Sequence, residues 1–151
     1  MIFYLLLLLL NSNFIYGKNY TELTNSLMKD YNSNIIPIYN NEYVNLTMGM
    51  ALRSLNKIDQ MDGTLSANIW LRYNWKDEFL TWNPDDCDGI TKIVLNTDPD
   101  YSDTIWTPDI YIYNTAEMPM DNIKFSRAIV SYTGDVSWSR PGIIDSTCVF
   151  D

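Results

Sequence analysis

TLSANIWLRY, residues 64–73, alternates apolar and polar side chains along its whole length. Such alternation is typical of a β-strand with one buried face, and the Asp62-Gly63 pair in front of it is a preferred hairpin turn. Residues 44–53 alternate in the same way before that turn, which predicts a second, half-buried strand. The expected core face of the later strand carries Leu65, Ala67, Ile69, Leu71 and Tyr73.

Trp70 lies on the other face of this predicted strand, among small and polar residues. Leaving a large apolar side chain in water forgoes about 1.5 to 3 kcal/mol of burial, so an indole on a polar face needs a reason. Trp70 is therefore a candidate ligand-contacting residue. Cover by a neighbouring loop of the same chain, or by another subunit, is the alternative explanation.

The other predicted elements are one helix and one hairpin. Residues 21–31 place Leu23 and Leu27 four apart, which predicts a short amphipathic helix with Thr21 as its N-cap. Around a turn at residues 133–135, alternation assigns Ala128, Val130, Tyr132, Val136 and Trp138 to a core face and Ile129, Ser131, Ser137 and Ser139 to the other face. Residues 82–106 are acidic and typical of a loop region. Together these patterns predict an all-β fold, an incomplete immunoglobulin-like β-sandwich preceded by one short N-terminal α-helix.

Composition excludes several classes of function. The 151 residues carry a net charge of −9, which argues against nucleic acid and suits a cationic ligand, although the same charge also serves to keep a domain soluble. The chain has no histidine, which removes the commonest general base and most zinc sites. The acidic stretch fails as an EF-hand loop, because Gly89 at its sixth position would put Pro84 and Leu95 at ligand positions. A solvated acidic loop is the favoured interpretation, and a looser site of side-chain and carbonyl oxygens is the alternative. We therefore expect no enzyme, no cofactor and no metal site.

The N-terminus has the pattern of a secretory signal peptide over residues 1–17. An apolar run at residues 2–10 precedes a polar stretch that ends at Gly17, and the run is too short to span a bilayer as a helix. Asn19 and Asn45 stand in Asn-x-Thr triplets and are candidate glycosylation sites. The expectation is one domain, residues 18–151, in the secretory pathway.

Two segments carry a resemblance to a known family: NIWLRYNWKDEFLTWNPDD at residues 68–86 and IWTPDIYIYN at residues 105–114. Their tryptophans, prolines and aspartates resemble the extracellular domain of nicotinic acetylcholine receptor subunits, in the pentameric Cys-loop ligand-gated ion channel family. The likeness implies the N-terminal part of the ligand-binding domain of a cation-selective channel subunit. The implied partners are a small acetylcholine-like cation and homologous subunits in a pentameric ring, with the membrane reached only through segments absent from this chain.

The resemblance also implies roles for single residues. In the family the agonist lies between two adjacent subunits, which contribute a principal and a complementary face. Tyr113 matches the first principal loop. The complementary face is matched by Trp70, Arg72, Ile129, Ser137 and Ser139. Plain solvent-facing strand positions are the alternative for the isoleucine and the two serines.

Cys148 matches the first cysteine of the family's signature disulfide loop, and its implied partner lies beyond Asp151; no bridge between Cys148 and Cys87 is expected. The later principal loops and every membrane helix of the family are absent from the sequence, so the piece is expected to be unstable alone. The first hypothesis is a receptor function at the extracellular side of the plasma membrane. The alternatives are a secreted, acetylcholine-binding-protein-like decoy without a pore and a non-functional truncated fragment.

Overall fold

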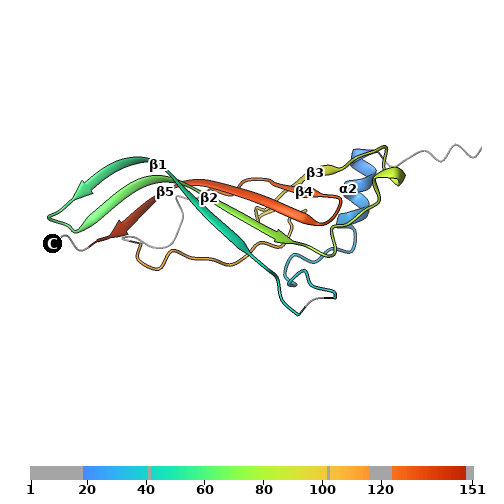
Figure 1. Cartoon of the computed structure of the whole chain (residues 1–151), viewed down its shortest axis with the longest axis horizontal. Helices are drawn as coiled ribbons and strands as arrows, with labels where there is room; N and C mark the ends of the chain where they lie inside the picture. Colours follow the sequence, from blue (N-terminus) through green and yellow to red (C-terminus); the bar gives the residue numbers. More distant parts are fainter. Residues whose placement is uncertain (1–18, 41, 102, 116–123, 149–151) are drawn as a thin grey trace, which may run out of the picture.

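The computed structural model describes residues 19–40, 42–101, 103–115 and 124–148; the predicted signal peptide, residues 1–17, lies outside them. The elements are α2 (Tyr20–Met28), β1 (Thr47–Asp59), β2 (Thr64–Lys76), the 3-10 turn η2 (Pro84–Asp86), β3 (Lys92–Leu95), β4 (Ala128–Ser131) and β5 (Asp135–Thr147). The strands form a five-stranded antiparallel sheet in the order β1-β2-β5-β4-β3 (Figure 1). The all-β prediction with one short N-terminal helix is confirmed, and this single sheet is consistent with an incomplete sandwich.

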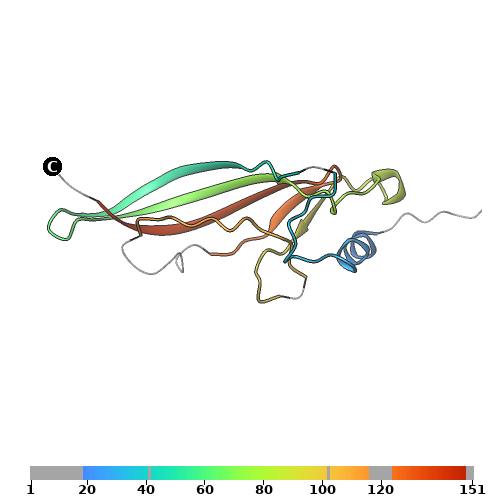
Figure 2. The ribbon, with the colours of Figure 1, turned by 90° about the horizontal axis from the view of Figure 1, so that it is seen from below.

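The two faces of the sheet differ in cover. We call the face that carries Ile69, Leu71 and Tyr73 of β2 the inner face; these three side chains are each 1% exposed. Helix α2 and the segment 105–115 lie on one side of the sheet (Figure 2), and Ile110 and Ile112 of that segment pack against the buried core. The opposite, outer face has no such layer among the described residues. The predicted core face of β2 is thus confirmed.

Helix α2 begins earlier than expected, and the N-cap assigned to Thr21 is wrong. The Asn19 side chain accepts a hydrogen bond from the Glu22 backbone N–H at 3.0 Å, and the Glu22 carboxylate accepts from the Asn19 backbone N–H. This reciprocal capping box satisfies two backbone donors at once, so Asn19 caps the helix and Thr21 lies inside its first turn. The helix ends at Met28, not at residue 31.

The hairpin of β4 and β5 confirms most of the predicted faces. Ala128 and Val130 of β4 pair with Trp138 and Val136 of β5, and all four are buried. Tyr132 is the exception, because it lies in the turn rather than in a strand and is 42% exposed. Strand β5 also continues far past the predicted hairpin and pairs with β2 along its whole length. The acidic region 82–106, expected to be loop, contributes η2 and the short strand β3.

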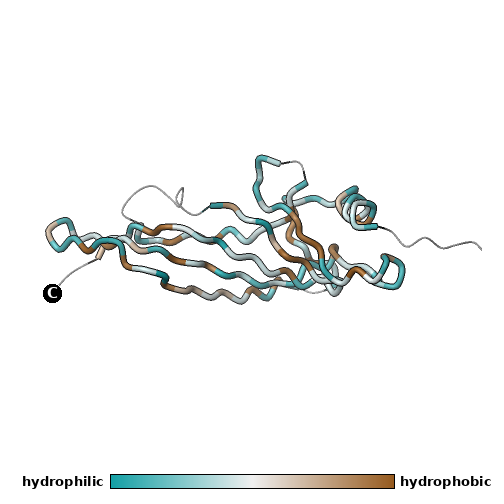
Figure 3. The backbone as a smooth tube through the Cα atoms, turned by 90° about the horizontal axis from the view of Figure 1, so that it is seen from above, coloured by the Kyte–Doolittle hydropathy of each residue, from teal (hydrophilic) through white to brown (hydrophobic). Residues whose placement is uncertain are grey.

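The predicted half-buried strand at residues 44–53 is right in its alternation but wrong in its bounds and its burial, because β1 runs from Thr47 to Asp59 and is largely exposed. Its apolar residues Met48, Met50 and Leu52 lie opposite the inner-face residues of β2, yet they are 48%, 64% and 64% exposed. The reason is that β1 is an edge strand, and the covering segment packs over the centre of the sheet. Figure 3 shows hydrophobic positions recurring along the long strands, the edge strand included.

A buried carboxylate connects the helical segment to the sheet. Asp77 follows directly after β2 and is fully buried. It accepts a hydrogen bond of 2.6 Å from the Tyr31 hydroxyl, which in turn accepts one from the Trp106 backbone N–H at 3.0 Å. Burial raises the pKa of Asp77 above its usual value and outweighs the hydrogen bond from Tyr31, which opposes the rise. The Trp106 ring meets the Trp75 ring edge to face at 5.9 Å. These contacts fix the start of the segment 105–115 against the sheet.

Candidate functional site

The candidate complementary-face residues lie together on the outer face. Strand register pairs Trp70 with Pro141, Arg72 with Ser139, Asn74 with Ser137, and Ser137 with Ile129. Because paired residues in an antiparallel sheet project to the same side, these residues of three adjacent strands form one continuous surface. We call Trp70, Arg72, Ile129, Ser137 and Ser139 the outer wall.

Trp70 is the large aromatic of the outer wall. Its side chain is 41% exposed, while its strand neighbours Ile69 and Leu71 are each 1% exposed on the inner face. The ring borders a pocket of about 390 Å³ whose lining also includes Arg53 and Lys124. The Arg53 guanidinium carbon lies 5.9 Å from the centre of the indole ring. The indole is therefore neither buried under a loop nor fully bare.

The rest of the outer wall is polar with one apolar contact point. The Ser137 hydroxyl donates to the Asn74 side-chain oxygen at 2.8 Å, and Ser139 accepts a hydrogen bond at its backbone oxygen from the Ser126 hydroxyl. Ile129 is 49% exposed. A surface with two serines, one of them with its hydroxyl hydrogen-bonded to Asn74, beside an isoleucine and an indole suits a small ligand with both apolar and polar parts.

Tyr113 lies apart from the outer wall. It follows Ile110 and Ile112, which point at the inner-face core, and its own side chain is fully exposed. The neighbouring Asn114 anchors this segment to the end of β5, where its carbonyl oxygen accepts from the Thr147 backbone N–H at 3.0 Å. Tyr113 and Trp70 therefore stand on opposite sides of the sheet, and one chain does not bring them into a single site.

The likeness of this chain to known proteins extends over most of its length. Residues 20–151 match the family model of the neurotransmitter-gated ion-channel ligand binding domain. The chain belongs to this family. Human neuronal acetylcholine receptor subunit alpha-9 is 32% identical over 136 residues, which are 89% of this chain and 27% of the human protein. Acetylcholine receptor subunit alpha-like 2 of Drosophila melanogaster is 33% identical over 148 residues, 97% of this chain and 25% of the fly protein.

These relatives confirm the resemblance to nicotinic receptor subunits. The chain spans about a quarter of the length of the curated relatives it matches. The matched part is the neurotransmitter-gated ion-channel ligand-binding domain, which is not an enzyme family. In the described residues no helix is long and apolar enough to cross a membrane, and no group of three or more acidic or cysteine side chains is placed to hold a metal ion.

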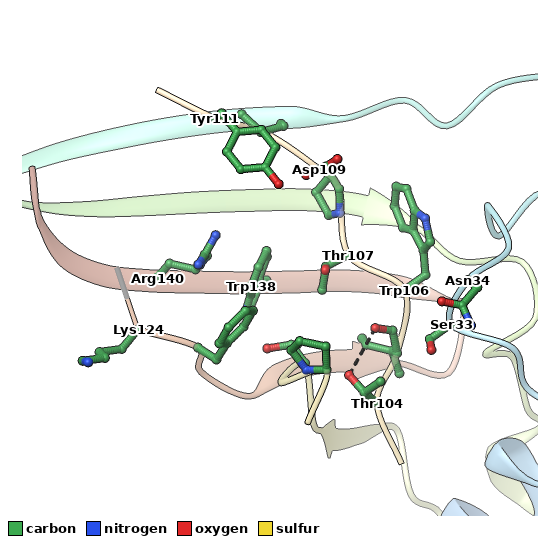
Figure 4. Close-up of a pocket in the computed structure, with 16 residues that line it drawn as sticks. Ser33, Asn34, Thr104, Trp106, Thr107, Asp109, Tyr111, Lys124, Trp138 and Arg140 are labelled. Atoms are coloured by element: carbon green, nitrogen blue, oxygen red, sulfur yellow. Dashed lines mark hydrogen bonds between the residues drawn. The ribbon is translucent and has the colours of Figure 1, made fainter. Parts of the chain in front are cut away.

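The ligand-binding domain also has a larger pocket that the sequence did not indicate. It measures about 710 Å³ and lies against the inner face, where Arg140 and Trp138 project from β5 toward the segment that carries Asp109 and Tyr111 (Figure 4). The Arg140 guanidinium is stacked 4.8 Å from the Trp138 ring and 5.1 Å from the ring of Phe125. Burial lowers the pKa of Arg140, whose side chain is 8% exposed. The sequence signal for it is an arginine that follows Val136 and Trp138 in the alternation of the core face.

The two cysteines of the domain are far from each other. Cys148 lies beside the β1–β2 turn, where its backbone N–H donates to the Gly63 carbonyl oxygen at 2.7 Å. Cys87 is buried directly after η2, at the other end of the molecule from the C-terminal end of β5 (Figure 1). Both thiols are free, and the implied partner of Cys148 beyond residue 151 stays a prediction. The candidate glycosylation sites Asn19 and Asn45 are both exposed.

Proposed function

We propose that this ligand-binding domain uses its outer wall as one half of a site for a small acetylcholine-like cation. The observation that carries the proposal is the half-exposed indole of Trp70 on a polar sheet face. A quaternary ammonium group is attracted to the face of an indole by about 0.5 to 2 kcal/mol, more when water is excluded. Ile129 and the hydroxyls of Ser137 and Ser139 then contact the rest of the ligand.

The other half of the site comes from a homologous subunit. Tyr113 stands on the side of the sheet opposite Trp70, so the two aromatics of one chain serve two different junctions. Repetition of such a two-sided contact around an axis closes a ring, and we propose the pentameric ring of a cation-selective channel. The relatives named above are acetylcholine receptor subunits, which supports this assignment.

We propose that the domain passes through the secretory pathway to the extracellular side of the plasma membrane. Residues 1–17 have the pattern of a signal peptide. Asn45 is exposed just before β1, where an attached glycan has room. Enzymatic deglycosylation of the secreted chain followed by mass analysis tests this point, and an unmodified Asn45 would contradict it.

Titration of the full chain with acetylcholine, followed by tryptophan fluorescence, tests the proposed site. Trp70→Ala is expected to weaken binding about 2- to 30-fold, which is the affinity equivalent of the cation–π range above. Tyr101→Ala, at an aromatic residue that is 62% exposed outside the outer wall, is the matched control and is expected to bind as the wild type does. Equal binding by wild type and Trp70→Ala would refute the proposed role of the indole.

A further inference from the structure

The face of the Trp70 ring already carries a cation from the same chain. The Arg53 guanidinium carbon lies 5.9 Å from the centre of the ring, within the distance of roughly 6 Å at which a guanidinium is attracted to an indole. The position of Arg53 follows from the pairing of β1 with β2. Register passes from Leu52 opposite Ile69 directly to Ser54 opposite Asn68, so Arg53 is a bulged residue without a partner across the strand pair.

A second cation borders the same pocket. Lys124 joins Arg53 and Trp70 in the lining of the pocket of about 390 Å³, and the described lining residues include no aspartate or glutamate. The Lys124 backbone N–H donates to the carbonyl oxygen of Pro141 at 3.3 Å, and Pro141 is the residue of β5 that pairs with Trp70. The chain as a whole is acidic, yet the immediate surroundings of this indole are basic.

Like charge at this distance changes affinity measurably. Two unit charges about 6 Å apart in water repel by roughly 0.7 kcal/mol, which corresponds to a factor of about three in affinity. A small cation that reaches the ring must also displace the guanidinium. The attraction between Arg53 and the indole is then lost, which reduces the net gain from binding. Both effects act against an external cation and have a common origin in one side chain.

We propose that Arg53 is a resident cation that screens Trp70 from small external cations and sets the cation affinity of the outer wall. The proposal rests on the proposed function only for the class of ligand. Arg53 is thus a specificity-determining residue. Its removal opens the indole, whereas loss of Trp70 removes the surface for which both cations compete.

Collisional quenching tests the screening without any assumption about the natural ligand. Caesium and iodide are small quenchers of opposite charge, and subtraction of the Trp70→Phe signal isolates the emission of this one indole. In the full chain at constant ionic strength, iodide is expected to quench Trp70 more strongly than caesium. Arg53→Leu is expected to raise the caesium quenching constant about twofold, because salt weakens the threefold effect given above.

Matched variants separate the contact from charge in general. Lys57 lies on the same strand as Arg53, and its ammonium group forms an ion pair with Asp59 at 2.9 Å. Lys57→Leu removes this cation and is expected to leave caesium quenching of Trp70 unchanged. Arg53→Lys keeps the charge and loses the planar stacking, so it should fall between wild type and Arg53→Leu. Equal caesium quenching in wild type and Arg53→Leu, or an equal rise in Lys57→Leu, would overturn the screening.

Titration with tetramethylammonium, a bare quaternary cation, connects the screening to ligand binding. Arg53→Leu is expected to bind it about two- to fivefold more tightly than the wild type. Equal affinity in the two proteins would overturn Arg53 as a determinant of specificity. If caesium gains access in Arg53→Leu while no variant binds tetramethylammonium, the screening stands and the proposed function of the outer wall fails.

Discussion

Replacement of Gly134 by alanine is expected to be among the most damaging single changes to the outer wall. Gly134 adopts φ = 84° in the β4–β5 turn, a left-handed conformation that costs an L-residue about 1 to 2 kcal/mol. A Cβ at this position would press against the Asp77 carbonyl oxygen and stand 3.1 Å from Cγ2 of Thr81. The Gly134 carbonyl oxygen also accepts a hydrogen bond from the Asp77 backbone N–H at 2.8 Å, so a shift of the turn away from Asp77 would lengthen this bond.

The magnitude follows from the sum of the two effects. Backbone strain of about 1 to 2 kcal/mol and crowding of about 1 to 3 kcal/mol predict a loss of roughly 2 to 5 kcal/mol in the free energy of unfolding. Gly89 provides the matched control, since it has φ = 75° but nothing within 4 Å of an added Cβ. Gly89→Ala therefore pays the conformational cost alone, and its expected loss is about 1 to 2 kcal/mol.

Urea unfolding followed by circular dichroism measures both variants on one scale. With a slope of about 2 kcal/mol per molar urea, Gly134→Ala should lower the midpoint by roughly 1 to 2.5 M and Gly89→Ala by less than about 1 M. Because the turn fixes the register of Ser137 and Ser139, ligand binding should fall with stability only in Gly134→Ala. An equal midpoint shift in the two variants would refute the contribution of crowding at Asp77.

Three further predictions concern the core, the helix and the edge strand. Burial raises the pKa of Asp77, so the folded chain binds this proton more tightly than the unfolded chain; its stabilising contribution is complete below pH 3.8 and is lost as pH rises through the folded-state pKa. Asp77→Asn should remove that part of the pH dependence. Urea midpoints measured from pH 3.8 upward should therefore change less with pH in the variant than in the wild type. Asn19→Ala should lower the free energy of unfolding by about 1 kcal/mol through loss of the capping box, and an unchanged urea midpoint would contradict it. Met50→Thr, at an edge position that is 64% exposed, should change that free energy by no more than about 0.5 kcal/mol, and sedimentation should detect less aggregate.

Alternation of side chains was sufficient to predict which residues share a face. Trp70, Ser137 and Ser139 were assigned to the side opposite the core, and strand pairing confirms that they lie on one surface. Alternation holds within a strand that has no bulge, whatever the partner, because successive side chains point to opposite faces of the sheet. This is why the faces of β2, β4 and β5 were predicted although the full extent of β5 was not.

Side-chain alternation does not predict how deeply a strand is buried or how it is aligned with its neighbour, because both depend on the partner strand. Met50 has the pattern of a buried residue, yet its strand is at the edge of the sheet. Two bulges in β1 leave Arg53 and Asn56 unpaired and keep Leu52, Leu55 and Ile58 on the inner face. Spacing of three between those apolar residues was the available signal, since strict alternation would place Leu55 on the opposite face from its two neighbours.

The charge of the binding surface shows why composition is a poor guide to specificity. A net charge of −9 predicts that cations gather around the whole domain. Exposed charges more than about 10 Å away are largely screened at 0.1 M salt, so the groups next to Trp70 dominate the final step of binding. Those groups include Arg53 and Lys124, both cationic. Long-range attraction and local repulsion therefore act in opposite directions on the same ligand, and added salt should weaken the attraction while it leaves the short contact between Arg53 and the indole in place.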